Sequence, residues 1–329
     1  WSWKPAVPDW TSDDESCKAL EREWVIDGQT WRSQVPPTAW DVNSPTFIRD
    51  QFMASPLLDE LILEGARHLI QTYKLGQGEA TDLLAVSLSA NDYIGHRYGT
   101  QGPEMCDQQV RLDRELGRFL NDLEQLGVPF LVVLSADHGG LDFPERLNAV
   151  DRREAGRVES QAFMREVNAA LRGQLGLDYD PLHASGLDQL WVVDRNGRSP
   201  SSDFRKKVVE VALPLLRQRP EVEAVFDREV LLNTPVDRTK PVDEFSLQER
   251  FALSTVADRS ADISVALKPF LQTTMPEPGV SMTGHGTVWN YDRRVPILFW
   301  WPGVTPQERP LPVPTVDIAP TLAHILGIQ

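Results

Sequence analysis

The chain has 329 residues and a formal net charge of −15, with 41% hydrophobic and 25% charged residues. This composition is ordinary for a globular protein, and the length suffices for one large α/β domain or two smaller ones. The acidic balance excludes a general binder of nucleic acid or anionic membranes, and no segment is apolar over the roughly 18 residues that cross a bilayer.

The first 55 residues have little periodicity and predict irregular structure with one short hairpin. Its turn is Asp27-Gly28 in VIDGQTW, a dipeptide that favours a two-residue hairpin turn. The chain starts WSWKPAVPDW, without an initiator Met or a signal peptide, so we expect a mature or cut piece of a longer protein. Cys17 and Cys106 are too few for a disulfide scaffold, and one bridge or two inert thiols both stay open.

From residue 56 onward, helical and strand patterns alternate. Apolar residues at helical spacing predict a helix over 57–75, and a short apolar run predicts a buried strand over 82–89. A second long helix is predicted over 103–127, between Pro103 and Gly127, and a strand follows over 129–136. This order predicts an α/β fold with a mainly parallel central sheet and helices on both faces.

The alternation of predicted helices and strands continues less regularly in the rest of the chain. Helices are predicted over 159–173, 202–218 and 317–326, and strands over 187–194, 221–227, 261–267 and 295–301. A loop rich in Pro, Gly and Thr spans 272–287. We therefore expect an irregular segment over 1–55 and one α/β domain over 56–329, with an elaborated region over about 140–260.

Two predicted strand ends each deliver an acid and an imidazole. SLSANDYIGHRYG places Asp92 and His96 after the first strand, and SADHGG places Asp137 and His138 after the second. Because functional groups collect beyond the carboxyl ends of strands in open α/β sheets, loops can aim both pairs at one point. His285 in MTGHGTVW is a third candidate, since its flanking glycines let the backbone turn sharply near a site.

Carboxylates with imidazoles are the ligand mix of zinc, and less specifically of manganese or iron. Asp92, His96 and His285 would form a three-ligand site with an open position, the catalytic arrangement for zinc. Asp137 and His138 supply only two ligands to a second ion, so this count indicates a ligand outside the chain. Each pair alone is typical of a turn or helix cap, and only their combination favours a metal site.

The other histidines give weaker signals. His68 and His324 lie in predicted helices and are expected to serve packing or the surface. His183 lies in a predicted loop, where it could serve the site or have no role in it.

These motifs resemble the alkaline phosphatase superfamily. SLSANDYIGHRYG, SADHGG, GHGTVWNYDRRVPILFW and VPTVDIAPTLAHILGI occur in the family's order within residues 56–329. They are most similar to bacterial periplasmic alkaline phosphatases with a threonine nucleophile, relatives of the nucleotide pyrophosphatase/phosphodiesterases. The resemblance implies that Asp92, His96 and His285 bind one zinc ion and that Asp137 and His138 bind a second.

The resemblance also implies parts that this sequence lacks. In such enzymes an early region supplies an Asp ligand, the attacking Thr, and Asn, Lys and Arg contacts to the phosphate, and residues 1–55 match none of these motifs. We therefore expect an N-terminal segment of the same enzyme, carrying the nucleophile, outside this chain. The implied activity is hydrolysis of phosphomonoesters through a phosphothreonine, in a monomeric enzyme that is periplasmic or secreted.

Alternatives stay open at this point. A phosphodiesterase or nucleotide pyrophosphatase would use the same metals, and a catalytically silent metal-binding module would have lost the nucleophile. A sulfatase is disfavoured, because neither SCKALER nor MCDQQVR fits a Cys-x-Pro-x-Arg motif. Cofactor-independent phosphoglycerate mutases share the metal scaffold, but DYIGHRYG fits them poorly.

Overall fold

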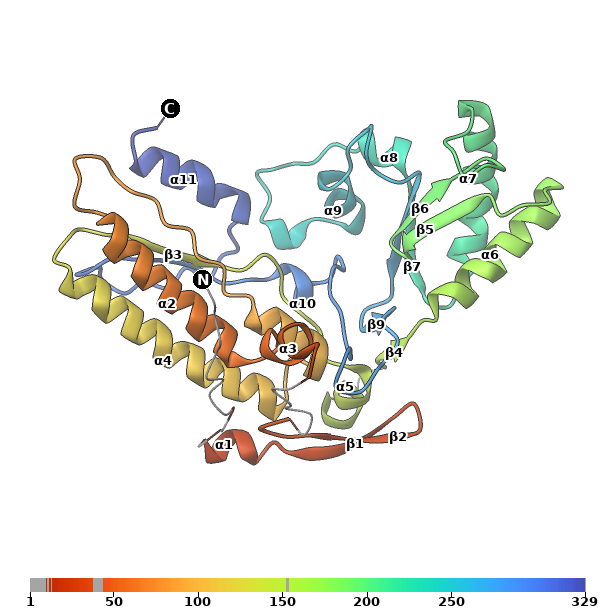
Figure 1. Ribbon diagram of the computed structural model, residues 1–329. Coiled ribbons are helices and arrows are strands. Elements are labelled where there is room, and N and C mark those ends of the chain that lie inside the picture. Colours follow the sequence, from red (N-terminus) through yellow and green to blue (C-terminus); the bar gives the residue numbers. More distant parts are fainter. Residues whose placement is uncertain (1–9, 11, 13, 38–43, 152–153, 329) are drawn as a thin grey trace.

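A computed structural model describes residues 10, 12, 14–37, 44–151 and 154–328. Long helices lie at one side of the molecule, a small sheet covered by two helices lies at the other, and short helices lie between them (Figure 1). Along the described residues, no helix combines the length and apolarity that a membrane crossing requires.

The N-terminal region carries the predicted hairpin. Helix α1 (Glu15–Lys18) precedes strands β1 (Arg22–Ile26) and β2 (Gln29–Ser33), which pair antiparallel. Asp27 and Gly28 have positive φ angles of 49° and 75°, as a tight two-residue turn requires, so this prediction is confirmed. Cys17 and Cys106 form a disulfide, which decides the alternative that the sequence left open.

Three helices outside the elaborated region agree with their predicted positions. They are α2 (Pro56–Tyr73), α4 (Pro103–Gln125) and α11 (Ile318–Ile325), the last preceded by a 3-10 turn at Thr315–Asp317. Both α2 and α4 begin with proline, whose missing N–H is no loss in a first helical turn. A π-helical turn at Ile48–Phe52 leads into α2.

The predicted strand over 82–89 is wrong. These residues have no regular secondary structure, because no strand pairs with them among the described residues. The strand predicted over 129–136 exists in shorter form as β3 (Val132–Ser135), and its one partner in the described chain is β10 (Ile297–Trp300). A strand forms only where a neighbouring strand accepts and donates its backbone hydrogen bonds, and an apolar sequence pattern does not show whether such a neighbour exists.

The expected parallel pairing is also wrong for the described residues. Pairing of β3 with β10 is antiparallel, and the one parallel pairing in the described chain joins β4 (Gly156–Arg157) to β9 (Leu271–Gln272). The parallel sheet was predicted from the alternation of helices with strands over 82–89 and 129–136, and the first of these strands does not form. The α/β class itself is confirmed by the mixture of helices and sheets.

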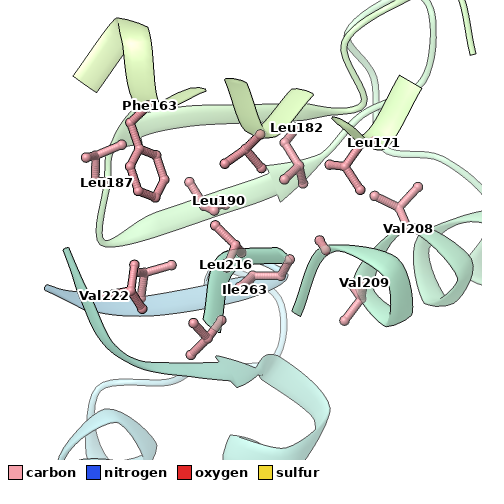
Figure 2. Close-up of a cluster of buried hydrophobic side chains, with 14 of the residues drawn as sticks. Phe163, Leu171, Leu182, Leu187, Leu190, Val208, Val209, Leu216, Val222 and Ile263 are labelled. Carbon is pink, nitrogen blue, oxygen red and sulfur yellow. The ribbon is translucent and has the colours of Figure 1, made fainter. Parts of the chain in front are cut away.

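The largest hydrophobic core lies in the region predicted to be elaborated. Its strands β5 (Leu182–Gly186), β6 (Gln189–Val192), β8 (Ile263–Leu267) and β7 (Val222–Asp227) pair antiparallel in that order. Helices α6 (Ser160–Leu175) and α7 (Ser202–Arg217) pack on the sheet and bury side chains such as Phe163, Leu190 and Ile263 (Figure 2). His183, predicted to lie in a loop, lies on β5 opposite Trp191.

Besides α1, five short helices of the described chain were not predicted from the sequence. They are α3 (Ala90–Tyr98), α5 (Pro144–Asp151), α8 (Arg228–Leu232), α9 (Leu247–Leu253) and α10 (Asn290–Arg293). A further 3-10 turn covers Val242–Glu244. Of these elements, α3, α5 and α10 lie in the middle of the molecule, between the two outer groups (Figure 1).

Candidate metal centre

Helix α3 carries the first predicted pair. Asp92 lies in its first turn and His96 in its last, so the two residues are on a helix and not in a loop as predicted. Residues four apart share one face of a helix. The carboxylate oxygen Oδ1 of Asp92 accordingly lies 3.3 Å from Nε2 of His96.

His285 reaches the same point from a distant part of the chain. Its Nε2 lies 3.4 Å from Oδ1 of Asp92 and 3.1 Å from Nε2 of His96. One ligand atom from each of these three residues lies within 4.8 Å of the others. The three-residue cluster that the sequence predicts is therefore assembled in the structure.

The second predicted pair adjoins this cluster. Nε2 of His138 lies 3.7 Å from Oδ1 of Asp92, and its ring stacks on that of His285 with centroids 3.4 Å apart. Oδ2 of Asp137 lies 3.6 Å from Nε2 of His138, on a side chain that is 87% exposed. All five predicted residues thus gather in one place, and Asp137 is the most open to solvent.

Backbone carbonyls fix the orientation of two imidazole rings. Nδ1 of His96 donates to the carbonyl oxygen of Thr283 at 2.8 Å, and Nδ1 of His138 donates to that of Gly139 at 2.7 Å. A carbonyl only accepts, so the proton lies on Nδ1 and the lone pair of Nε2 faces Asp92. Imidazole nitrogens with free lone pairs beside a carboxylate are the ligand set that zinc prefers.

The surroundings of His285 favour its neutral form. Burial and the neighbouring rings of His138 and His96 lower the pKa of His285 below its ordinary value, against the opposing effect of Asp92. Only a neutral imidazole binds a metal ion, so this shift favours the ligand form at neutral pH.

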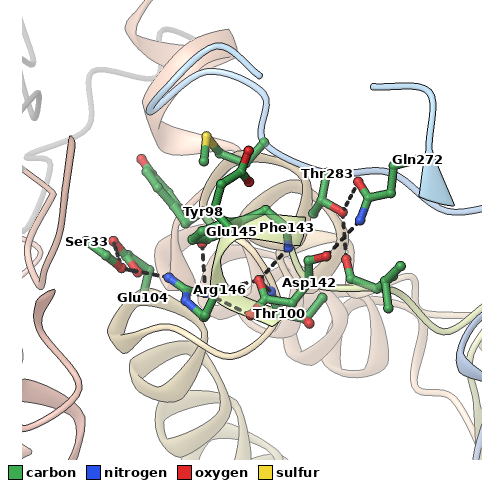
Figure 3. A network of polar contacts seen from close by, with 12 residues as sticks. Ser33, Tyr98, Thr100, Glu104, Asp142, Phe143, Glu145, Arg146, Gln272 and Thr283 are labelled. Atoms are coloured by element: carbon green, nitrogen blue, oxygen red, sulfur yellow. Dashed lines mark hydrogen bonds and ion pairs between the residues drawn. The ribbon is translucent and has the colours of Figure 1, made fainter. Parts of the chain in front are cut away.

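A buried hydroxyl ties the loop of His285 to the loop that follows His138. The Oγ1 hydroxyl of Thr283 lies 2.6 Å from the carbonyl oxygen of Leu141 and 2.8 Å from Oε1 of Gln272, and these two acceptors share its single proton (Figure 3). The amide N–H of Met282 also donates to the carbonyl oxygen of His96 at 2.7 Å. These bonds hold the separate ligand-bearing segments against one another.

Two glycines let the same loops approach closely. A Cβ atom on Gly139 would lie 2.2 Å from the carbonyl oxygen of Tyr291, so only glycine fits there. Gly286 has a φ of 102°, a conformation that favours glycine directly after His285. The N–H of Gly139 donates to the carbonyl oxygen of Asp292 at 2.7 Å, which joins α10 to the site.

A buried charged network supports the end of α3. The guanidinium of Arg146 donates to Oδ1 of Asp142 at 3.1 Å and to Oγ of Ser33 at 3.1 Å (Figure 3). Ser33 in turn donates to Glu104 at 2.8 Å. Burial raises the pKa of Glu104 to about 7, against the opposing effects of its hydrogen bonds and of Arg146. The network joins the hairpin, α4 and the loop before α5.

Sequence reasoning missed the supporting residues Thr283, Gln272, Arg146 and Asp292. All four are buried polar residues, with exposed fractions of 3%, 7%, 4% and 4%. Their partners are up to 142 residues away in sequence, as for Thr283 with Leu141. The glycines around His285 were the one local signal of a closely packed loop.

The predicted ligands line one end of a large cavity. Its volume is about 1740 Å³, and its other walls come mainly from apolar residues of α2, α4, residues 83–88 and β3. The remaining predicted histidines lie elsewhere: His68 is exposed on α2, and His183 and His324 do not line this cavity.

Solved structures share this fold. The crystal structure of wild-type alkaline phosphatase PafA matches with a TM-score of 0.66 and 26% sequence identity, over 84% of this chain and 51% of that one. A variant of PafA with four substitutions matches with a TM-score of 0.68 over 99% of this chain and 60% of that one, at 24% identity. The fold is therefore that of the alkaline phosphatases.

The family follows from the sequence as well. The profile of type I phosphodiesterase / nucleotide pyrophosphatase matches residues 3–267, and the chain belongs to this family of the alkaline phosphatase superfamily. It is 38% identical to alkaline phosphatase PhoD of Zymomonas mobilis over 84% of its length, and 37% identical to alkaline phosphatase PhoK of Sphingomonas sp over 87%. It spans about half of these relatives, 48% and 52%.

Proposed function

We propose that the chain forms the metal-binding part of a phosphate-ester hydrolase, an alkaline phosphatase acting on phosphomonoesters. The observation that carries this proposal is the convergence of three Nε2 atoms, those of His96, His138 and His285, within 3.7 Å of Oδ1 of Asp92. The relatives named alkaline phosphatase, at 37% and 38% identity, support monoesters as the substrate class.

In this proposal, Asp92, His96 and His285 hold one zinc ion, and Asp137 and His138 contribute to a second. Zinc ions bound there would supply positive charge that neutralises a phosphoryl group and lowers the pKa of a coordinated hydroxyl. The chain has a net charge of −15, so it has little else to attract an anionic ester. The histidines act by presenting Nε2 while the backbone holds the proton on Nδ1 of His96 and His138.

The nucleophile belongs to the proposal too. The five gathered side chains are carboxylates and imidazoles, and we assign to them ligand roles only. The resemblance implies a threonine that becomes transiently phosphorylated, and we place it in a segment of the enzyme outside residues 1–329. The relatives have such additional length, since the chain spans about half of each.

A phosphodiesterase or nucleotide pyrophosphatase is the second candidate. The description of the matching family, type I phosphodiesterase / nucleotide pyrophosphatase, favours it. Both candidates use the same metal centre, and they differ in the contacts that recognise the free phosphate charge of a monoester.

We further propose that the enzyme works as a monomer in the periplasm or outside the cell. The disulfide between Cys17 and Cys106 supports an oxidising compartment, since such bonds are rare where glutathione keeps thiols reduced.

Zinc titration of the chelator-stripped chain tests the metal centre. We expect the substitution His285→Ala to weaken zinc binding by at least about tenfold, as loss of a ligand does, while His68→Ala leaves it unchanged. Equal zinc binding by His285→Ala and the unsubstituted chain would contradict the proposal. Circular dichroism of each variant would confirm that the fold is retained.

Hydrolysis assays on an enzyme that includes the nucleophile segment test the reaction. We expect p-nitrophenyl phosphate to be cleaved faster than bis-p-nitrophenyl phosphate, and a chelator to abolish both activities. Preference for the diester would favour the second candidate. No turnover of either ester with zinc present would indicate a catalytically silent module.

A further inference from the structure

Helix α3, which carries Asp92 and His96, needs support from the rest of the chain. It has nine residues, whereas isolated helices shorter than about 12–15 residues are marginal in water. Within the described chain, its N-cap residue Ser89 makes no side-chain hydrogen bond to the first turn, although a serine side chain often caps a helix in this way. The N–H groups of that turn therefore need acceptors from another element.

Asp59 of α2 supplies such an acceptor. Its carboxylate oxygen Oδ1 accepts from the N–H of Ala90, the first residue of α3, at 3.1 Å. Asp59 is 2% exposed and Ala90 is fully buried, so water does not compete for this bond. Asp59 also lies in the first turn of α2, so the N-termini of two helices, both of which favour negative charge, meet at its carboxylate.

A glutamine of α4 holds this carboxylate in place. Nε2 of Gln108 donates to Oδ2 of Asp59 at 2.7 Å, and Gln108 is fully buried. Burial raises the pKa of Asp59, against the opposing effects of the N–H of Ala90, the Gln108 amide and the N–H of Ser89. All three of these donors are neutral, so the surroundings of Asp59 require a hydrogen-bond acceptor more than they require a charge.

The first turn of α3 determines where Asp92 lies. Asp92 follows Ala90 by two residues, and its Oδ1 is the atom around which the three imidazoles gather. Nε2 of His138 and Nε2 of His285, at 3.7 Å and 3.4 Å from this oxygen, belong to other segments of the chain. A first turn that frayed would therefore move Asp92 away from both nitrogens.

We propose that Asp59 is a positioning residue of the metal centre, which raises its affinity for the ion by fixing the first turn of α3. Asp59 is not a ligand, and it acts on Asp92 through the N–H of Ala90. The other end of α3 is held separately by Arg146, which donates to the carbonyl oxygen of Tyr98 at 3.3 Å. The inference rests on the proposed metal centre, and it adds a residue of α2, which carries none of the five predicted ligands.

Zinc titration of two variants tests this role. Asp59→Ala removes the acceptor, and we expect it to weaken zinc binding about three- to tenfold, less than the roughly 10–100-fold that follows loss of a ligand's own hydrogen-bond partner. Asp59→Asn keeps an acceptor at Oδ1. Rotation of the Gln108 amide would turn its Oε1, which has no partner among the described residues, toward the new Nδ2. We therefore expect Asp59→Asn to bind zinc as tightly as the unsubstituted chain.

Asn168→Ala is the matched control for the loss of buried hydrogen bonds. Asn168 is 4% exposed and makes two hydrogen bonds of 3.0 Å with the backbone of Leu182, in the sheet of the elaborated region. We expect urea denaturation to show a loss of stability for both alanine variants, and zinc affinity to fall only for Asp59→Ala. Equal zinc affinities of the two alanine variants would mean that Asp59 has a purely structural role, and would overturn the proposal.

Cobalt in place of zinc reports the geometry of the centre. The visible absorption of Co²⁺ depends on the arrangement of its ligands, so we expect the spectrum to change in Asp59→Ala and to be restored in Asp59→Asn. An Asp59→Asn variant that restores neither the spectrum nor zinc affinity would overturn the proposal. Failure of the metal centre itself is recognised separately, because His285→Ala would then bind zinc as tightly as the unsubstituted chain, and it would overturn this inference as well.

Discussion

Replacing Thr283 by valine tests how the ligand-bearing loops are held together. Valine keeps the shape of threonine and removes the hydroxyl, whose single proton is shared by the carbonyl oxygen of Leu141 at 2.6 Å and Oε1 of Gln272 at 2.8 Å. All three residues are buried, with exposed fractions of 3%, 6% and 7%. Water therefore cannot readily replace the lost donor.

The magnitude follows from the loss of this one shared donor. Leaving a buried polar group unsatisfied costs about 1–3 kcal/mol, so the free energy of unfolding should fall by about that amount. Thr283 also accepts from Nδ1 of His96 through its carbonyl oxygen, and it lies two residues before His285. Valine keeps that carbonyl, so zinc affinity changes only through a shift of the loop, and we expect a loss smaller than the roughly 10–100-fold that removal of a ligand's hydrogen-bond partner causes.

Two measurements check this prediction: urea denaturation of the metal-free chain and zinc titration of the folded chain. Thr283→Ser, which retains the hydroxyl, is the matched control and should bind zinc nearly as tightly as the unsubstituted chain. The reasoning is refuted if Thr283→Val unfolds at the same urea concentration and binds zinc with unchanged affinity.

Three other predictions follow from the same structure. Arg146→Met leaves Asp142 buried without its ion-pair partner and should destabilise the fold by about 3–5 kcal/mol in chemical denaturation; a loss within error of zero would contradict the network's role. Reducing the Cys17–Cys106 bridge, which closes a sequence separation of 89, should cost up to about 4–5 kcal/mol, seen as a lower Tm with reductant. The pKa of His285 is lowered from 6.5 in the folded chain, so the unfolded chain takes up the proton first and stability should fall as the pH drops below 6.5. Zinc affinity of the folded chain should fall over the same range, and an affinity that rises as the pH drops would contradict this.

The elements that were predicted correctly are those with strong local signals. Apolar spacing and an initial proline place α2 and α4, and the Asp27-Gly28 dipeptide places the hairpin turn. Helix α3 was missed because ANDYIGHRY contains Asn, Asp and Gly, which have low helix propensity. Its one helical cue was the spacing of four between Asp92 and His96, which put both residues on one face.

Long-range pairing could not be predicted from these local signals. The apolar pattern of 82–89 predicts a buried strand, but a ladder depends on a neighbouring strand that no local pattern specifies. The antiparallel pairing of β3 with β10 joins residues far apart in sequence, such as Ser135 with Ile297.

The positions of the site residues were predictable, and their support was not. Asp92, His96, Asp137, His138 and His285 stand in short recognisable motifs, and the structure brings them together. Thr283 and Gln272 stand in no motif, because any buried donor and acceptor of suitable shape could make their hydrogen bond.

The central claim is tested most directly by anomalous scattering at the zinc edge from crystals of the zinc-loaded chain. The account predicts one zinc ion bound by Asp92, His96 and His285, with a second beside Asp137 and His138. Crystals whose zinc lies only at surface histidines such as His68, with these five side chains left without an ion, would contradict it.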